Sequence, residues 1–365
     1  MLAAMRRLVL TVTLTAAGIV PALALGPMAK ADDRAGGPAT ELLDKGERLF
    51  RQGDTAGALR AFDEAARADP RNAQAPFFRG VALEKKGDAG AAMAAYRQAI
   101  ALRADFAEAH NGLGTLLLAR GDKPGATREL QAAVKANPAY PEAQYNLGIA
   151  LDAQGKRSEA IAAYRAAAAL KPGEGTYQLD LGAALLKTGD VEGALGALRI
   201  ATQRLPKNGV AWGNLGLALS AKKSYDEARK ALERSVQLQP DYADGWNGLG
   251  RAALRQGQLP AAITALERAR KLDAKSAAFA ADLCHAHLEG RDAAHAVAEC
   301  RAAVTLDPGY AFARYELGKA LVAQGECAAA GTELAKFRAL PGVKPEAQAR
   351  AEALGKLCVP AKKKE

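Results

Sequence analysis

The sequence predicts an all-α solenoid of about nine helix–turn–helix units, closed by a C-terminal capping helix. Two residue types recur along most of the 365-residue chain at one constant interval, which is the distance from Gly216 to Gly250. Glycine recurs in one series, with Cys284 as its single exception, and alanine recurs in the other. The glycines are Gly46, Gly80, Gly114, Gly148, Gly182, Gly216, Gly250 and Gly318; the alanines are Ala58, Ala92, Ala126, Ala160, Ala194, Ala228, Ala262, Ala296 and Ala330. A period of this length indicates stacked supersecondary units that bury their apolar faces against their neighbours.

Each unit contains two amphipathic helices in the same order. In the unit around Gly216, Leu215 and Leu219 place an apolar stripe along the first helix, while Ala228 and Leu232 mark the second. Between the helices a glycine recurs, which suits the left-handed residue that ends a helix. An acid often follows it, where negative charge favours the start of the next helix. Proline closes most second helices, because it cannot continue them.

This pattern resembles the tetratricopeptide repeat, or TPR. In one unit the resemblance is carried by an aromatic residue at the fourth position, Leu-Gly at the seventh and eighth, alanine at the twentieth and proline at the thirty-second. These residues are Trp212, Leu215, Gly216, Ala228 and Pro240. The resemblance covers nine units without an insertion and implies a right-handed superhelical solenoid.

The frame of the repeat predicts the domain boundaries. Residues 32–38 are expected to be a linker, residues 39–344 the nine tandem units, residues 345–358 the capping helix and residues 359–365 a basic tail. The first residues of the units are Ala39, Ala73, Ala107, Pro141, Gly175, Gly209, Ala243, Ala277 and Ala311. A terminal helix is expected because a repeat array must cover its last apolar face.

Residues 1–31 are predicted to be a signal peptide. Arg6 and Arg7 precede an apolar run over residues 8–20, and the segment ends in the small-residue pattern Ala29-Lys30-Ala31. This order is typical of secretory signals, so we expect cleavage after Ala31 and a periplasmic or secreted protein. The alternative is an uncleaved inner-membrane anchor, because residues 8–25 are just long enough to span a bilayer.

Charge and motifs argue against several classes of function. Removing residues 1–31 takes away three basic residues and no acid, which lowers the formal charge from +10 to +7. The remaining basic residues are interspersed with acids, as on a solvated surface, so no nucleic acid partner is expected. The sequence has no haem-attachment motif, phosphate-binding glycine loop or nucleophile elbow. We therefore predict no enzymatic activity and no cofactor.

The histidines predict no metal site. His285 and His287 are two residues apart and should diverge on a helix, whereas a pair of metal ligands would be spaced by three or four. His110 and His295 are isolated in the sequence. The cysteines have no Cys-x2-Cys spacing of the kind that binds zinc.

All four cysteines lie near the C-terminus, from Cys284 onward. An even number in an exported chain indicates disulfides, although the count leaves three pairings open. In the repeat frame, Cys284 and Cys300 should face the same seam between two antiparallel helices, and Cys327 and Cys358 should meet where the last second helix lies beside the capping helix. We therefore predict the pairs Cys284–Cys300 and Cys327–Cys358. The alternative is four buried thiols that act as small hydrophobic residues.

The resemblance to TPR proteins also implies a ligand groove lined by the first helix of each unit. Carboxamides on that face can donate to and accept from a peptide backbone at once, and exposed aromatic residues are enriched at recognition hot spots. The alternative is a solvated face for the polar residues and core packing for the aromatic ones. The predicted groove residues are Phe77, Phe78, Asn111, Tyr145, Asn146, Asn214, Asn247, Arg251, Arg255 and Tyr315.

These features predict a non-enzymatic scaffold in the cell envelope that binds an extended peptide or a partner domain in its groove. Its setting would be the assembly of an envelope complex, such as pilus, secretion or cell-wall machinery, and that complex could be associated with the membrane. The alternative is a carbohydrate-binding accessory subunit of polysaccharide synthesis or export, which would use stacked aromatic rings and carboxamides.

Overall fold

A computed structural model describes residues 37–358, and every regular element in this range is an α-helix. The described residues form two compact units, residues 37–184 and residues 185–358. The predicted signal peptide and basic tail lie outside the described residues, as does the linker up to residue 36. Within residues 37–358, no helix is both long enough and apolar enough to cross a membrane.

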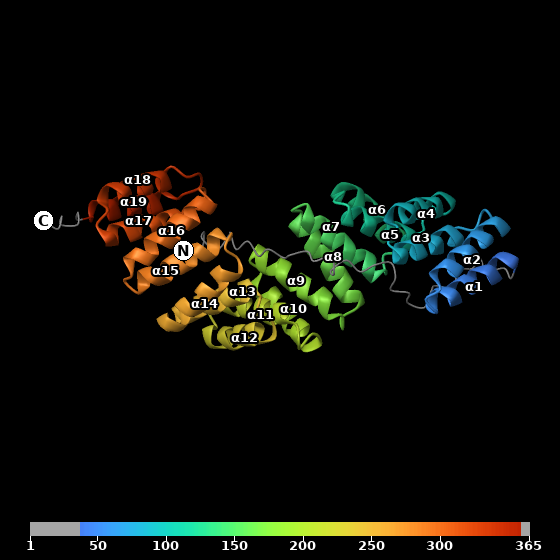
Figure 1. Cartoon of the computed structure of the whole chain (residues 1–365), viewed down its shortest axis with the longest axis horizontal. Helices are drawn as coiled ribbons and strands as arrows, with labels where there is room; N and C mark the ends of the chain where they lie inside the picture. Colours follow the sequence, from blue (N-terminus) through green and yellow to red (C-terminus); the bar gives the residue numbers. More distant parts are fainter. Residues whose placement is uncertain (1–36, 359–365) are drawn as a thin grey trace. The chain divides into compact units, whose positions relative to one another are not determined.

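The unit of residues 37–184 is a stack of antiparallel helix pairs (Figure 1). Each pair consists of two helices joined by a short turn, and the second helix of one pair contacts the first helix of the next. The helices are α1 (Pro38–Arg51), α2 (Thr55–Ala68), α3 (Gln74–Lys86), α4 (Ala89–Leu102), α5 (Ala107–Ala119), α6 (Lys123–Ala136), α7 (Pro141–Ala153) and α8 (Arg157–Leu170). Helix α9 (Gly175–Thr188) contains the boundary between the two units.

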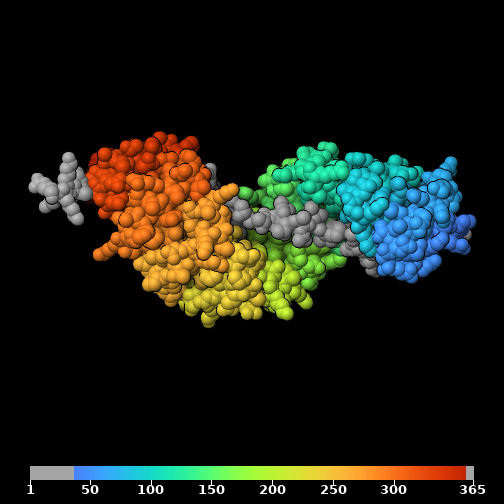
Figure 2. All heavy atoms as spheres, in the orientation of Figure 1, coloured from blue at the N-terminus to red at the C-terminus, as the bar shows by residue number. Residues whose placement is uncertain are grey.

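The unit of residues 185–358 repeats the same arrangement. Its colours change steadily along the stack because successive helix pairs lie side by side (Figure 2). The helices are α10 (Val191–Arg204), α11 (Gly209–Ala221), α12 (Tyr225–Leu238), α13 (Ala243–Arg255), α14 (Leu259–Leu272), α15 (Ala277–Glu289), α16 (Ala293–Leu306), α17 (Ala311–Gln324), α18 (Cys327–Arg338) and α19 (Pro345–Lys356).

The periodic glycine series is explained by the seam inside each helix pair. A Cβ atom added to Gly216 on α11 would lie 2.5 Å from Cγ of Leu232 on α12. The same separation holds between Gly250 on α13 and Leu266 on α14. Since no side chain fits there, the first helix carries glycine despite its cost in a helix interior. The alanines of the second series are all 0% exposed, because they occupy the same tight seam.

The turns inside the pairs follow the predicted chemistry, with two exceptions. Most carry glycine with a positive φ, such as Gly87 at +86° and Gly257 at +72°. In the sixth and eighth repeats the left-handed residues are Lys223, at φ +69°, and Arg291, at φ +59°. A side chain in this conformation is strained. These two turns therefore keep the same backbone conformation as the glycine turns, at an energetic cost.

Helix α19 covers the last helix pair. Its buried Ala351 packs with Leu334 and Phe337 of α18, and its half-buried Ala347 and Leu354 flank this cluster. This contact removes from water the apolar surface that a further repeat would otherwise have covered.

Candidate functional site

The two phenylalanines predicted to line a groove lie in the core of the unit of residues 37–184. Phe77 and Phe78 are 6% and 5% exposed. The ring centroid of Phe77 is 4.8 Å from that of Phe106, and the centroid of Phe78 is 5.6 Å from that of Phe62. The groove role predicted for this pair is therefore corrected: both rings stabilise packing between helices, which was the alternative interpretation.

Tyr145 is also buried, at 0% exposed. Its ring stacks on Tyr177 with centroids 4.5 Å apart, and its hydroxyl donates a hydrogen bond of 2.5 Å to Oδ2 of Asp180. Burial, together with the charge of Asp180, raises the pKa of Tyr145 far above its usual value. Tyr145 therefore donates to the neighbouring helix, and its predicted place in a groove is corrected as well.

The predicted asparagines make the same kind of contact between repeats. Nδ2 of Asn146 donates to Oδ1 of Asn111 over 2.9 Å, and Nδ2 of Asn247 donates to Oδ2 of Asp282 over 3.0 Å. All four predicted asparagines, including Asn214, are buried. Their carboxamides are thus placed inside the stack, and their predicted role as surface contacts for a peptide is corrected.

One rule of spacing unites these hydrogen bonds. Each joins the fifth position of one first helix to the sixth position of the next, a separation of 35 residues. The three pairs are Asn111–Asn146, Tyr145–Asp180 and Asn247–Asp282. The fifth position therefore faces the next repeat in these three cases and makes a polar contact with it.

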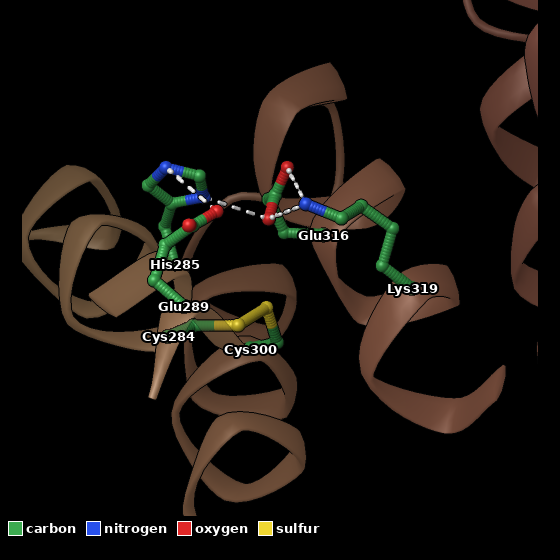
Figure 3. Close-up of polar contacts among 6 residues, drawn as sticks. All are labelled: Cys284, His285, Glu289, Cys300, Glu316 and Lys319. Atoms are coloured by element: carbon green, nitrogen blue, oxygen red, sulfur yellow. Dashed lines mark hydrogen bonds and ion pairs between the residues drawn. A yellow bond between two sulfur atoms is a disulfide. The ribbon is translucent and has the colours of Figure 1, made fainter. Parts of the chain in front are cut away.

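A different set of side chains, most of them partly exposed, forms a row in the unit of residues 185–358. We call it the polar strip: Arg251 on α13, Asp282 and His285 on α15, and Glu316 and Lys319 on α17. Figure 3 shows its central contacts, in which His285 and Lys319 converge on Glu316 from two helices. The two contacts measure 3.1 Å from Nδ1 of His285 and 2.9 Å from Nζ of Lys319, both to Oε2 of Glu316.

The strip follows the period of the repeat. Its bases Arg251, His285 and Lys319 occupy the ninth position of three consecutive repeats, so each is one period from the next. The first two bases each face the acid at the sixth position of the next first helix. Nε of Arg251 lies 3.9 Å from Oδ2 of Asp282, in the same register as the contact between His285 and Glu316.

Glu316 is the buried centre of the strip, with 4% of its side chain exposed, whereas His285 and Lys319 are about one-third exposed. Burial alone would raise the pKa of Glu316, but the hydrogen bond from His285 and the charge of Lys319 hold it below its ordinary value. Glu316 is therefore an ionised acid that positions two partly exposed bases.

Two predicted groove residues remain near this surface. Arg251 belongs to the strip, and Arg255, one helical turn further along α13, is exposed. Tyr315 is half-buried, and its ring lies 5.2 Å from that of Phe337 beneath the terminal helix.

Asp282, His285 and Glu316 were missed in the sequence. Their signal was a base at the ninth position of one repeat followed by an acid at the sixth position of the next.

The first cysteine pair occupies the seam that glycine and a bulky leucine or aromatic residue occupy in other repeats. Cys284 on α15 replaces the glycine, Cys300 on α16 replaces the bulky residue, and the structure joins their sulfur atoms (Figure 3). Two small side chains fit this seam together, which explains the break in the glycine series. The structure also joins Cys327, at the start of α18, to Cys358, which follows α19. Both pairings correspond to the predicted ones.

Models of known protein families identify the repeat. A model described as tetratricopeptide repeat matches residues 43–107, 85–126, 111–175 and 247–311, and a second with the same description matches residues 208–275. The chain belongs to the tetratricopeptide repeat family. The predicted family and the all-α TPR fold are thereby confirmed. TPR proteins are generally non-enzymatic scaffolds that bind protein or peptide partners.

Solved structures share this TPR fold. The APC/C hetero-tetramer Cut9–Hcn1 is 20% identical with a TM-score of 0.56, and the match covers 77% of this chain and 55% of that one. A TPR protein from Parabacteroides merdae ATCC 43184 is 18% identical with a TM-score of 0.55, covering 68% of this chain and 98% of that one. Pseudomonas aeruginosa pilF is 19% identical with a TM-score of 0.51, covering 57% and 94%.

These similarities concern the fold alone, since every identity is at or below 20%. The TPR chain spans 55% of the length of the Cut9–Hcn1 chain that it matches. Among curated proteins, none matches it. The site must therefore be interpreted from its own residues.

Proposed function

We propose that this TPR protein is a non-enzymatic scaffold that binds a protein or peptide partner at the polar strip of residues 185–358. The observation that carries the proposal is the regular row of Arg251, His285 and Lys319, one base for each repeat. A partner that lies along successive first helices would meet a basic side chain at each step. Such periodicity favours an extended segment over a compact ligand.

The partner should carry both acidic and hydrogen-bonding groups. Arg251 and Lys319 keep a large part of their side chains exposed while each contacts an acid. Because those acids are themselves largely buried, the outward charge of the strip is mainly basic. Basic groups held in place by buried acids are pre-ordered, which reduces the entropy lost when a carboxylate or a backbone carbonyl binds them.

The carbohydrate-binding alternative depended on aromatic and carboxamide side chains at the surface. The structure buries Phe77, Phe78 and Tyr145 together with the asparagines proposed for that role. Sugar rings stack on exposed aromatic faces, and these rings are covered by neighbouring helices. The positions of these residues therefore favour the protein-binding proposal.

Action in the cell envelope is part of the proposal. It is supported by the N-terminal order of Arg6 and Arg7, an apolar run and a small-residue cleavage pattern. Two cysteine pairs are also typical of proteins that fold in an oxidising compartment. Identifying the partner would show which complex the protein helps to assemble, whether pilus, secretion or cell-wall machinery.

A site-specific crosslinking experiment tests the binding face. A photoreactive residue is placed at Arg255, beside the strip, and in a matched protein at Lys230, which is exposed on the second helix α12. We expect a partner to be crosslinked in living cells from Arg255 and not from Lys230. The double variant Arg251→Ala/Lys319→Ala should abolish that product, while Lys230→Ala/Arg268→Ala removes two exposed charges from second helices and should leave it unchanged. Equal crosslinking from both faces would refute the proposal.

A separate measurement tests the compartment. N-terminal sequencing of the protein recovered from the envelope fraction should begin at Asp32 if the signal is cleaved after Ala31. Recovery of the intact N-terminus, Met1, in the membrane fraction would instead support the anchored alternative.

A further inference from the structure

The turn between α15 and α16 gathers three side chains that can ligate a metal. His287 lies in the last turn of α15, Asp292 caps the start of α16, and His295 lies in its first turn. Their ligand atoms all lie within 4.8 Å of one another. Oδ2 of Asp292 is 2.6 Å from Nδ1 of His295 and 3.6 Å from Nδ1 of His287, and the two imidazole rings stack with centroids 5.2 Å apart.

The backbone of the turn holds the carboxylate in place. Oδ1 of Asp292 accepts the amide hydrogen of His295 over 3.2 Å, and the amide of Asp292 donates to the carbonyl of His287 over 2.9 Å. These bonds leave Oδ2 facing both imidazoles. The turn reaches this shape with Arg291 in the left-handed region, where most other turns carry glycine.

His287 is the side chain that the fold itself does not explain. At the same position the first six repeats and the last one carry leucine, for example Leu219 and Leu321. His287 is 9% exposed, and its Nδ1 makes no hydrogen bond to any of the described residues. Burying a polar nitrogen without a partner costs free energy. A ligand bound to Nδ1 would remove that cost.

Two further features suit a binding site. The bond between Cys284 and Cys300 joins α15 to α16 close to both histidines, which limits their relative motion. A surface hollow lined by His287, His295 and Glu299, among others, leads to the same point. The charges around this hollow are mixed, and Arg270 is paired with Glu299 over 3.1 Å. An ion would thus reach the cluster from solvent without facing an excess of basic residues.

We propose that His287, Asp292 and His295 bind a divalent transition-metal ion, with zinc as the ion to test. Two imidazole nitrogens and one carboxylate oxygen are the donor set of sites for zinc and related metals, whereas calcium and magnesium prefer oxygen alone. With bond lengths near 2.0–2.1 Å, the donors of a tetrahedral site lie about 3.3 Å apart. His287 and Asp292 are close to that spacing, and the exposed ring of His295 can adjust to it. Water or a donor from a partner would complete the coordination.

Titration of the full chain with zinc chloride tests the site. The protein carries no histidine tag, is first stripped with a chelator, and is studied by isothermal calorimetry. We expect one saturable zinc ion per chain. His287→Leu introduces the residue that most other repeats carry at this position and should weaken binding by at least about tenfold. Asp292→Asn should do the same, because asparagine keeps the helix cap but removes the carboxylate.

The matched control is His110→Ala, which removes the imidazole of a histidine in the other compact unit, residues 37–184. Its zinc affinity should equal that of the unaltered chain. Cobalt gives a second readout, since a visible absorption band of tetrahedral cobalt should appear with the unaltered chain and be absent with Asp292→Asn. Failure of the unaltered chain to bind zinc, or equal affinity in His287→Leu, would overturn the proposal. These outcomes are independent of whether a partner binds the polar strip.

Discussion

The Nδ1 atom of His285 lies 3.1 Å from Oε2 of Glu316, so a base of the eighth repeat is held by an acid of the ninth. This contact connects the stability of the stack to the surface that we propose for binding. Lys319 approaches the same carboxylate from its own helix. Glu316 therefore supports two exposed bases at once.

Replacement of Glu316 should change how stability depends on pH. The folded pKa of Glu316 lies below the ordinary value of 4.5, so its stabilisation is present above that value and is lost as the pH falls through the folded pKa. Glu316→Gln should lower the free energy of unfolding near neutral pH by about 1–3 kcal/mol. It should also show a shallower loss of stability on acidification. Urea unfolding across this range measures both, and Glu267→Gln, at an exposed position of α14, should match the unaltered chain.

Two glycine substitutions should have opposite effects. In Gly216→Ala the new Cβ would lie 2.5 Å from Cγ of Leu232, and relief of this clash should cost about 1–3 kcal/mol. In Gly196→Ala, on α10, no atom lies within 4 Å of the new Cβ, so higher helix propensity should stabilise by about 0.5–1 kcal/mol. Thermal unfolding of the two variants side by side measures the difference. A destabilised Gly196→Ala would contradict the open space at that position, and a neutral Gly216→Ala would contradict the close contact with Leu232.

The hydrogen bond from Tyr145 to Asp180 should be measurable as a link between repeats. Tyr145→Phe keeps the stacked ring but removes the donor to a partly buried carboxylate, which should cost about 1–3 kcal/mol. Tyr225→Phe is the control, because its hydroxyl makes no hydrogen bond among the described residues, and it should change stability by less than about 0.5 kcal/mol. Hydrogen exchange should show faster opening of α7 in Tyr145→Phe. Unchanged exchange there would show that the ring alone maintains the contact.

The cysteine pairs are tested by alkylation and mass spectrometry without reduction. We expect no alkylatable thiol and two crosslinked peptides, one joining Cys284 to Cys300 and the other joining Cys327 to Cys358. Closing loops of 16 and 31 residues should stabilise by about 3–4 kcal/mol each in the chain-entropy model. Cys284→Ser/Cys300→Ser should therefore unfold at lower urea concentration than the unaltered chain. Recovery of four free thiols would show that the cysteines only fill the seam.

The helices could be predicted because each repeat carries the same kinds of small and bulky residues at the same positions. A glycine such as Gly216 recurs wherever a bulky residue such as Leu232 occupies the facing helix, so the period alone reveals the pairing. The surface was harder to predict. Helical spacing places Asn146 on a first helix, but it does not show that the adjacent repeat covers that side of the helix.

The metal cluster was missed for a related reason. Spacing arguments on a single helix separate His287 from His285, and they leave His295 alone on the next helix. The turn reverses the chain between them and brings both His287 and His295 next to Asp292. A pattern of histidine, aspartate and histidine across a helix–turn–helix junction was the available signal.

The hydrogen bond between Asn111 and Asn146 has a consequence for how such a chain can change in length. If a gene lost the codons for residues 141–174, one whole repeat would disappear and Asp180 would take the place of Asn146 in the sequence. Asn111 would then face an aspartate, which is the combination already used by Asn247 and Asp282. The bond spans one period plus one residue, so deletion or duplication of complete repeats exchanges partners without breaking the register. Inheritance by whole units is thus compatible with a specific polar contact at this junction.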